Sequence, residues 1–277
     1  MSERVEQTAT STLTERQIRE RAYYDEYVRL RGPETVSFAP VEGHERRPWN
    51  AYWYVHELAG QWVAPGRTLL DYGCGPGVAS VLLARQGFDV HGFDISPQNV
   101  ARATALAERY GLSERAHFSV QAAERLTYPD DFFDIVVGLD ILHHVEIGMT
   151  IRECLRVLKP GGTAVFHEPV EAIVFDRLRN SRFGRWLVPA TTSFDRHITE
   201  DERKLSPADL RVIREIAPDL TLQPFLLFAR LDHVVQYRRK LKWSPLERLD
   251  GVLLRWVPGL GRFAGKVVMT FRKPATA

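Results

Sequence analysis

The stretch LLDYGCGPGVASVLLA, residues 69–84, constrains the fold more than any other part of the chain. Its three glycines, Gly73, Gly75 and Gly77, lie between a short apolar run and a helix-like segment. Glycine suits this place because the backbone must turn tightly and approach a ligand closely. A strand, a glycine-rich turn and a helix in this order indicate a nucleotide-binding α/β sheet, although the same turn also occurs as a plain strand-to-helix connection.

The rest of the chain alternates apolar runs with helical patterns. Continuous apolar runs are typical of strands buried on both faces, and such strands need crossover helices, so we predict a doubly wound parallel sheet. The expected strands are 67–72, 88–93, 116–120, 133–139 and 162–167, and the expected helices are 77–86, 97–110 and 149–158. Two later runs, 220–228 and 266–272, are expected to close the sheet as a hairpin-like edge pair.

Further helical patterns flank this sheet. Residues 13–30 predict an amphipathic helix that stops at Gly32-Pro33, and residues 49–62 predict a second, aromatic-rich helix. The connection after the fifth strand is too long for a bare loop, which predicts a lid. The expected division is an N-terminal helical lid, 1–62, and a ligand-binding domain, 63–277, with a substrate-lid insertion at 169–208 and a basic helical insertion at 230–262.

Composition narrows the class of protein. The 277 residues, 44% hydrophobic and 26% charged, suit one large globular domain. Neither a secretory leader nor an uncharged run of membrane-spanning length is evident, so we predict a cytoplasmic protein. Only Cys74 and Cys154 are present, without a Cys/His cluster at zinc spacing, so we expect packed, reduced thiols and no metal site.

Two acids distinguish between the nucleotide-like ligands. Asp71, at the end of the first strand, would repel a pyrophosphate but attract an ammonium or sulfonium group. The G-C-G-P-G spacing differs from the dinucleotide fingerprint, and the Lys-Ser/Thr of a Walker loop is missing. Asp94 ends the next strand, where a carboxylate can hold both ribose hydroxyls. S-adenosyl-L-methionine (SAM), with an adenine, a free ribose and a cationic amino-acid tail, satisfies both acids.

Four motifs in order, LLDYGCGPG, GFDIS, LDILHHV and VLKPGG, resemble the class I SAM-dependent methyltransferases, in particular the small-molecule branch that includes quinone-biosynthesis enzymes. The resemblance covers about residues 66–168. It implies a Rossmann-like, seven-stranded α/β sheet that is parallel with an antiparallel edge strand, and SAM as the cofactor. The cofactor-binding residues that we predict from the acids and the resemblance are Asp71, Gly73, Cys74, Gly75, Gly77, Asp94, Ile95, Asn99, Ala122, Ala123, Glu124, Leu139 and Tyr27.

The sequence departs from this family where the adenine edge is expected to bind. Members often carry Asp-Ala after the third strand, whereas this chain has Gln121-Ala122-Ala123-Glu124. Ala122 cannot accept a hydrogen bond from the adenine amino group. Either Glu124 or Gln121 takes over this contact, or adenine is bound more weakly.

Catalysis of methyl transfer requires alignment and, for a hydroxyl acceptor, a base. His144 is the first candidate for this base and His143 the second. An imidazole, with an unperturbed pKa of about 6.5, is suited to deprotonating a phenol or enol at neutral pH. Glu168, after the fifth strand, is an alternative base or a ligand for a substrate hydroxyl. For each of the three, a structural role as a helix cap, a packed side chain or an ion-pair partner is the competing interpretation.

Candidate substrate contacts come from three segments, each with a structural alternative, and from His167 after the fifth strand. Tyr23 lies with Tyr24 and Tyr27 on one helix face, which either covers the cofactor or forms a buried stripe. Trp53 belongs to an aromatic segment that either lines an acceptor pocket or anchors its helix. A charge cluster near 196–203 is explained by a capped helix start or by closure over the site. The predicted substrate contacts are Tyr23, Trp53, His167, Arg196 and His197.

The basic C-terminal part has three interpretations. Residues 230–273 carry eleven Lys or Arg and three acids, although the chain as a whole has a net charge of only +2. Residues 238–262 mix Arg and Lys with Leu, Val and Trp, as in an interfacial helix that meets anionic lipid. A helix pair packed on the sheet or on a second subunit, giving a homodimer, explains the same pattern. No nucleic-acid partner is expected, because no recognised binding motif accompanies the charge.

These observations predict a SAM-dependent methyltransferase acting on a small molecule in secondary metabolism or cofactor biosynthesis. The reaction we expect is O-methylation of an aromatic, polyketide-like or quinone-like hydroxyl. N-methylation and C-methylation are alternatives within the class. A scaffold that binds SAM without transferring its methyl group is the alternative outside it.

Overall fold

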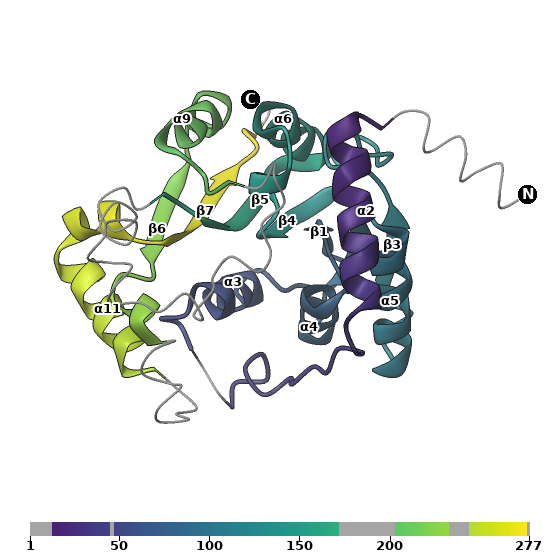
Figure 1. Cartoon of the computed structure of the whole chain (residues 1–277), viewed down its shortest axis with the longest axis horizontal. Coiled ribbons are helices and arrows are strands. Elements are labelled where there is room, and N and C mark those ends of the chain that lie inside the picture. The colour runs from purple at the N-terminus through teal and green to yellow at the C-terminus, as the bar shows by residue number, and fades with distance from the viewer. Residues whose placement is uncertain (1–12, 45–46, 172–202, 233–243, 276–277) are drawn as a thin grey trace, which may run out of the picture.

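The computed structural model describes residues 13–44, 47–171, 203–232 and 244–275 and contains a seven-stranded sheet in the order β3-β2-β1-β4-β5-β7-β6 (Figure 1). Strands β1 to β5 pair in parallel, and β7 is antiparallel to both of its neighbours. The strands are β1 (Thr68–Tyr72), β2 (Asp89–Asp94), β3 (Ala116–Val120), β4 (Phe133–Leu139), β5 (Leu158–Pro169), β6 (Thr221–Phe225) and β7 (Lys266–Arg272).

The predicted doubly wound α/β sheet is therefore confirmed, together with its antiparallel strand. That strand, β7, lies one position inside the edge, because β6 pairs along its outer side. Three strands, β3, β4 and β7, coincide with the predicted ranges. The runs of β3 and β7 are bounded on both sides by polar residues or glycine, and that of β4 ends at Asp140, so the pattern marks these limits.

Helices cover both faces of the sheet (Figure 1). One face packs on Ile151 of α6 and Ile213 of α9, and the other on Val55 of α3, Leu82 of α4 and Leu106 of α5. The α-helices are α2 (Glu15–Arg29), α3 (Ala51–Gly60), α4 (Val78–Gln86), α5 (Pro97–Arg109), α6 (Ile147–Val157), α9 (Pro207–Ile216) and α11 (Pro245–Trp256). Short 3-10 helices are η1 (Leu142–His144), η2 (Ala229–Leu231) and η3 (Pro258–Phe263).

Local signals explain where the helices begin. Ser96 caps α5 by accepting a hydrogen bond from the backbone of Asn99, and Pro97 occupies the first turn. Glu146 caps α6 in the same way, so this helix begins at Ile147, two residues before the predicted start. The cap of α6 is thus a glutamate rather than either of the neighbouring histidines.

The N-terminal helix α2 packs against α5 and lies across the carboxyl ends of the central strands (Figure 1). Asp25 of α2 accepts a hydrogen bond from Ser96 Oγ at 2.6 Å. Arg102 of α5 donates to the backbone carbonyls of Val28 and Arg31 at the end of α2. These contacts bring a helix from the start of the chain to the edge where the glycine turn lies.

Most of the predicted insertions fall outside the described residues. These include residues 172–202, with Arg196 and His197, and residues 233–243. Within the described ranges, no helix is both long enough and apolar enough to cross a bilayer.

Candidate functional site

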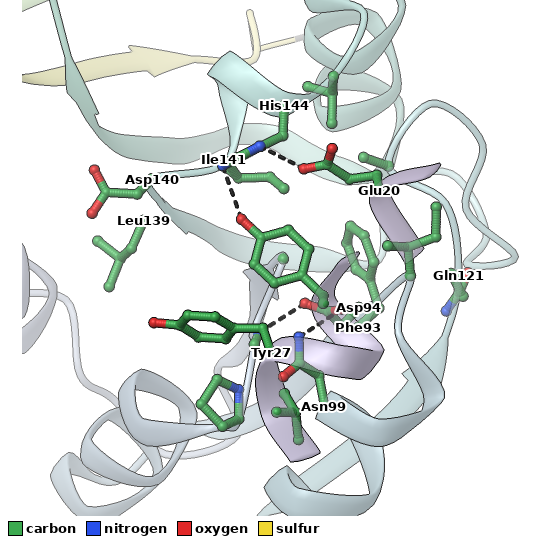
Figure 2. A pocket seen from close by; sticks show the side chains of 18 of the residues that line it. Glu20, Tyr27, Phe93, Asp94, Asn99, Gln121, Leu139, Asp140, Ile141 and His144 are labelled. Carbon is green, nitrogen blue, oxygen red and sulfur yellow. Dashed lines mark hydrogen bonds and ion pairs between the residues drawn. The ribbon is translucent and has the colours of Figure 1, made fainter. Parts of the chain in front are cut away.

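A cavity of about 220 Å³ lies between α2 and the carboxyl ends of the strands. Its walls come from α2, the glycine turn after β1, the end of β2, the start of α5, and the segments after β3 and β4 (Figure 2). Among the predicted site residues, the cavity is lined by Tyr27, Gly73, Gly75, Asp94, Ile95, Asn99, Ala123, Glu124, Leu139 and His144.

The glycine turn forms one wall, and its glycines have different reasons to be glycine. All three have positive φ angles, between 50° and 84°. A Cβ on Gly77 would lie 2.6 Å from Ala103 Cβ and 2.7 Å from its Cα, so this glycine permits close packing of two helices. A Cβ on Gly75 would meet nothing within 4 Å. The backbone at Gly75 therefore borders open space in the cavity, where a ligand can approach it closely.

Asp94 and Asn99 form the floor of the cavity and point toward each other (Figure 2). Asp94 Oδ2 accepts from the backbone N–H of Gly75 at 3.0 Å, and Oδ1 accepts from Ser96 N and Asn99 Nδ2 at 2.8 and 3.1 Å. Burial raises the pKa of Asp94, although these hydrogen bonds oppose the effect. Asn99 Oδ1 is buried, and no group of the described residues donates a hydrogen bond to it. A buried acceptor in a cavity wall favours a ligand whose hydroxyl group donates a hydrogen bond to it.

Asp71 lies behind the glycine turn rather than in the cavity wall. Its carboxylate is buried and accepts a hydrogen bond from Ser80 Oγ at 2.5 Å. Burial, with the nearby Asp94, raises the pKa of Asp71 to about 6, against the opposing effect of the Ser80 hydrogen bond. The thiol of Cys74 is buried as well and is not part of the cavity lining. Asp71 can therefore act on a ligand through its charge, but not through a direct contact in this arrangement.

The end of the cavity where adenine was expected is closed by Glu124. Its carboxylate accepts from Arg16 Nη2 and Gln17 Nε2, each at 2.7 Å, and from the backbone N–H of Glu146 at 3.1 Å. Gln121 also lines the cavity, but its amide is engaged with Ser119 and Thr127. Ala122 pairs with Arg125 in a short bridge and is not a lining residue. Of the two substitutes considered for the missing acid, Glu124 is thus the one with a carboxylate at the cavity.

His144 is held between two side chains of α2 (Figure 2). Its Nδ1 lies 2.6 Å from Glu20 Oε1, an approach without the geometry of a hydrogen bond. Its Nε2 lies 3.1 Å from the hydroxyl of Tyr24. All three residues line the cavity. The carboxylate of Glu20, the imidazole of His144 and the hydroxyl of Tyr24 thus lie in a row. Tyr24 and His144 are 120 residues apart in the sequence.

His143 and Glu168 form a separate pair beneath this group. Glu168 Oε2 lies 2.6 Å from His143 Nδ1, and Oε1 accepts from the backbone N–H groups of Ile141 and Leu142 at 2.8 and 2.7 Å. Glu168 is fully buried, and neither member of the pair lines the cavity. In this arrangement the pair fixes the turn after β4, which carries His144.

The remaining predicted residues lie around the cavity. Tyr23 packs on Tyr24 and Tyr27 but does not line it. Trp53 packs on Tyr52 and His56 within α3, again outside the lining. The tyrosines of α2 are half-buried rather than a buried stripe, and the buried residues of that helix are Glu20 and Val28. His167 is buried at the end of β5 beside Asp140 and Lys266.

The lining also contains residues that the sequence did not single out, among them Gln17, Glu20 and Arg102. The spacing of Glu20, Tyr24 and Tyr27 places them on one face of α2, and this was the available signal. The contact of this helix face with the cavity was missed because polar and aromatic residues share the face, so no apolar stripe predicts that it is buried.

Comparisons with known proteins identify the family of the chain. Residues 70–166 match the family model described as a methyltransferase domain. A 2-methyl-6-phytyl-1,4-hydroquinone methyltransferase of Synechocystis sp. is 42% identical over 119 residues, which cover 40% of this chain and 36% of that protein. A ubiquinone biosynthesis O-methyltransferase of Cereibacter sphaeroides is 30% identical over 177 residues, which cover 60% of this chain and 70% of that protein. The match thus spans about a third of the first relative and about two thirds of the second.

A solved structure supports the fold over nearly the whole chain. The geranyl diphosphate C-methyltransferase of Streptomyces coelicolor, crystallised with S-adenosyl-L-homocysteine, has a TM-score of 0.58. The comparison covers 94% of this chain and 98% of that one at 15% sequence identity. At this identity the likeness concerns the architecture alone.

Proposed function

The chain belongs to the class I SAM-dependent methyltransferases that act on small molecules, and on that premise we propose that it methylates a hydroxyl group of a small aromatic or quinone-like acceptor. In this proposal His144 is the base, Glu20 orients it, and the acceptor enters from the side of Tyr24. The names of the two relatives, a hydroquinone methyltransferase and a ubiquinone biosynthesis O-methyltransferase, support an acceptor of this chemical type.

SAM is the cofactor, and it supplies a methyl group carried by a positively charged sulfur. The residues of the cavity fit it. Asp94 and the unpartnered Asn99 Oδ1 suit ribose hydroxyls, and the open space at Gly75 suits a closely approaching ligand. Asp71 supplies a negative charge behind the turn, which favours a cationic ligand. We infer that Glu124 meets the adenine end, because its Oε2 accepts one hydrogen bond and a carboxylate oxygen can accept two.

The proposal of a hydroxyl acceptor rests on the two contacts of His144, one with Glu20 and one with Tyr24. In enzymes that activate a hydroxyl, an acid holds one imidazole nitrogen while the other nitrogen takes the proton. Here Glu20 occupies the first position and the hydroxyl of Tyr24 occupies the second, at 2.6 and 3.1 Å. We propose that an acceptor phenol replaces the Tyr24 hydroxyl at Nε2. His144 then accepts the phenol proton, and Glu20 stabilises the imidazolium that results.

Methyl transfer by the variant His144→Asn tests this role, with S-adenosyl-L-homocysteine affinity measured by calorimetry. We expect kcat for phenolic acceptors to fall about 100- to 10,000-fold, while affinity for the cofactor product changes less than about threefold. Glu20→Gln should lower kcat by a smaller factor and shift the pH profile. His117→Asn is the matched control, because His117 is a half-exposed histidine on β3, remote from the lining.

The alternatives predict other outcomes. An undiminished kcat in His144→Asn would show that His144 is not the base. It would favour an amine acceptor, which needs no base. Wild-type protein that binds the cofactor but methylates no phenol, amine or carbon acid would favour the non-methylating scaffold. Mass spectrometry of the product distinguishes O-, N- and C-methylation.

We also propose that α11 makes a peripheral contact with anionic lipid. The exposed positions of residues 245–262 include Arg248, Arg255 and Arg262 and no acid. Leu249, Val252 and Trp256 lie on the same helix face and are 44%, 53% and 78% exposed. A basic face with exposed apolar and aromatic side chains favours the surface of a bilayer, where a quinone-like acceptor with an apolar tail resides. A second copy of the chain is the competing occupant of this face.

A further inference from the structure

Three polar side chains meet at the carboxyl edge of the sheet, beyond the end of β4. Asp140 follows β4, His167 lies near the end of β5, and Lys266 is the first residue of β7. Because β7 runs antiparallel to β5, its first residue lies at the edge where the parallel strands end. The sheet topology therefore brings a lysine from the last strand to the site.

The contacts within this group are long. Lys266 Nζ lies 3.4 Å from Asp140 Oδ1 and 3.2 Å from His167 Nε2, and His167 Nδ1 lies 3.4 Å from Asp140 Oδ1. Other lysine–aspartate pairs of this protein are closer, with 2.6 Å between Lys273 and Asp131. A charge-assisted hydrogen bond typically spans about 2.7–2.9 Å. The ammonium of Lys266 is thus held in place without being closely paired.

Neutral His167 accepts one hydrogen bond from the ammonium of Lys266, and the ammonium has further N–H donors. Burial lowers the pKa of His167 to about 4, so its ring is neutral at pH 7. Its Nε2 must then accept a hydrogen bond from Lys266, which places the ring proton on Nδ1, facing Asp140. An ammonium has three N–H donors, and these contacts use at most two of them.

The position of Asp140 connects the group to the cavity. Its side chain lines the cavity and is 47% exposed (Figure 2). Its backbone has a positive φ of 54° and donates a hydrogen bond to the carbonyl of His167 at 2.8 Å. A left-handed conformation at a residue other than glycine is costly and is often found in binding sites. Here it turns the chain so that Asp140 and His144, four residues apart, both face the cavity.

We propose that Lys266 and Asp140 form a binding subsite for a second oxygen of the acceptor, a hydroxyl or an ionised oxygen distinct from the one that receives the methyl group. The oxygen accepts a hydrogen bond from Lys266 Nζ, and a hydroxyl there donates to Asp140. The acceptor class is therefore an aromatic ring with two oxygens, one directed to His144 and the other to Lys266. This assignment rests on the proposed function, since it presumes a hydroxyl acceptor at His144.

Binding measurements test the subsite without requiring turnover. Catechol, hydroquinone and phenol are titrated into the protein saturated with S-adenosyl-L-homocysteine, and the dissociation constants are measured by calorimetry. In the wild type, we expect catechol or hydroquinone to bind about 10- to 100-fold more tightly than phenol, the factor of a hydrogen bond to a charged group. Lys266→Gln should reduce this preference to less than about threefold while leaving phenol binding unchanged.

Lys273→Gln is the matched control, because Lys273 follows β7 and pairs with Asp131 at the surface, remote from the cavity. This variant should keep the wild-type preference. Thermal unfolding identifies a Lys266→Gln protein that fails to fold, and Asp140→Asn then supplies the second variant. The subsite is overturned if Lys266→Gln keeps the preference for two oxygens, or weakens all three ligands equally.

Turnover separates this inference from the proposed function. If the wild type binds catechol tightly through Lys266 but methylates none of the three acceptors, the subsite stands and the hydroxyl-transfer proposal fails. If it methylates phenol and catechol with equal KM and Lys266→Gln changes neither value, the proposed function stands and the subsite fails.

Discussion

Replacing Asp71 by asparagine should stabilise the protein and weaken cofactor binding at the same time. Burial raises the pKa of Asp71 to about 6 from an ordinary value of 3.8. Above pH 6 the folded chain therefore holds a buried carboxylate whose ionisation is unfavourable. Asparagine has nearly the same shape, keeps an oxygen for the Ser80 hydroxyl and carries no charge.

The size of the effect follows from the difference in pKa. A difference of about two pKa units at about 1.4 kcal/mol each gives about 3 kcal/mol. Because the pKa of Asp71 is higher in the folded state, the folded chain retains the proton longer. The wild-type free energy of unfolding therefore falls as pH rises from about 4 to about 6, and it is level above that range. Asp71→Asn lacks this fall, so its advantage grows from nearly zero at pH 4 to its full value at pH 7–8.

Chemical denaturation at several pH values between 4 and 8 measures this difference directly. Asp89→Asn is the control, because Asp89 is a half-exposed carboxylate on the neighbouring strand, and we expect a change below about 0.5 kcal/mol. Calorimetry should show SAM binding to Asp71→Asn weakened about 10- to 100-fold, since a negative charge near a cation is lost. A variant that is less stable than the wild type at pH 8, or that binds SAM unchanged, would refute the reasoning.

Two further predictions concern the glycine turn and α11. Gly77→Ala should lower the free energy of unfolding by about 2–5 kcal/mol in urea denaturation, because it combines a φ of 84° with a contact of 2.7 Å to the Ala103 backbone, and an unchanged midpoint would contradict this. Arg255→Glu with Trp256→Ala should abolish sedimentation with vesicles containing phosphatidylglycerol, while Arg85→Glu on α4 has no effect. Equal sedimentation of both variants would show that the α11 face does not bind anionic lipid. Loss of a dimer in light scattering would assign this face to a second copy of the chain.

The sheet was predictable from the sequence because each central strand is buried on both faces and bounded by turn residues. Val136 and Val137, successive residues of β4, are both fully buried, so the run is continuous and its limits are clear. The same holds for Val267, Val268 and Met269 of β7, whereas β3 is partly exposed and only its Ala116 is buried. The cofactor end of the site was partly predictable for a related reason. Asp94 and Asn99 lie within six residues of a strand end, so local geometry brings them together.

The position of Asp71 was only partly predictable. Its place at the end of β1 follows from the apolar run, but the direction of its side chain depends on which face of the strand α4 covers. In the fold, Ser80 of α4 meets the carboxylate behind the turn. The carboxylate from which the ligand was inferred is therefore close to the turn, but it does not line the cavity.

The partners of His144 were not predictable, because Glu20 and Tyr24 come from a helix more than 100 residues earlier in the chain. The docking of α2 depends on polar contacts at both of its ends, and such contacts leave no periodic apolar signal. Arg16 and Gln17 bind Glu124 at one end, and the carbonyls of Val28 and Arg31 bind Arg102 at the other. The acid that lies at His144, Glu20, is brought there by the docked helix.

This docking connects the two halves of the proposed reaction through one helix. The first turn of α2 contacts Glu124, where adenine is expected, and its middle turns contact His144, the proposed base. A rigid helix cannot move away from one contact without disturbing the other, because the two lie within three turns of each other. We therefore expect the orientation of His144 to be coupled to what occupies the adenine end, since the same helix carries Glu20 and Tyr24 to the imidazole and Arg16 and Gln17 to Glu124. Under the proposed function, such coupling would prepare His144 as the base when the cofactor end is closed, and closing that end would also exclude water from the reacting groups.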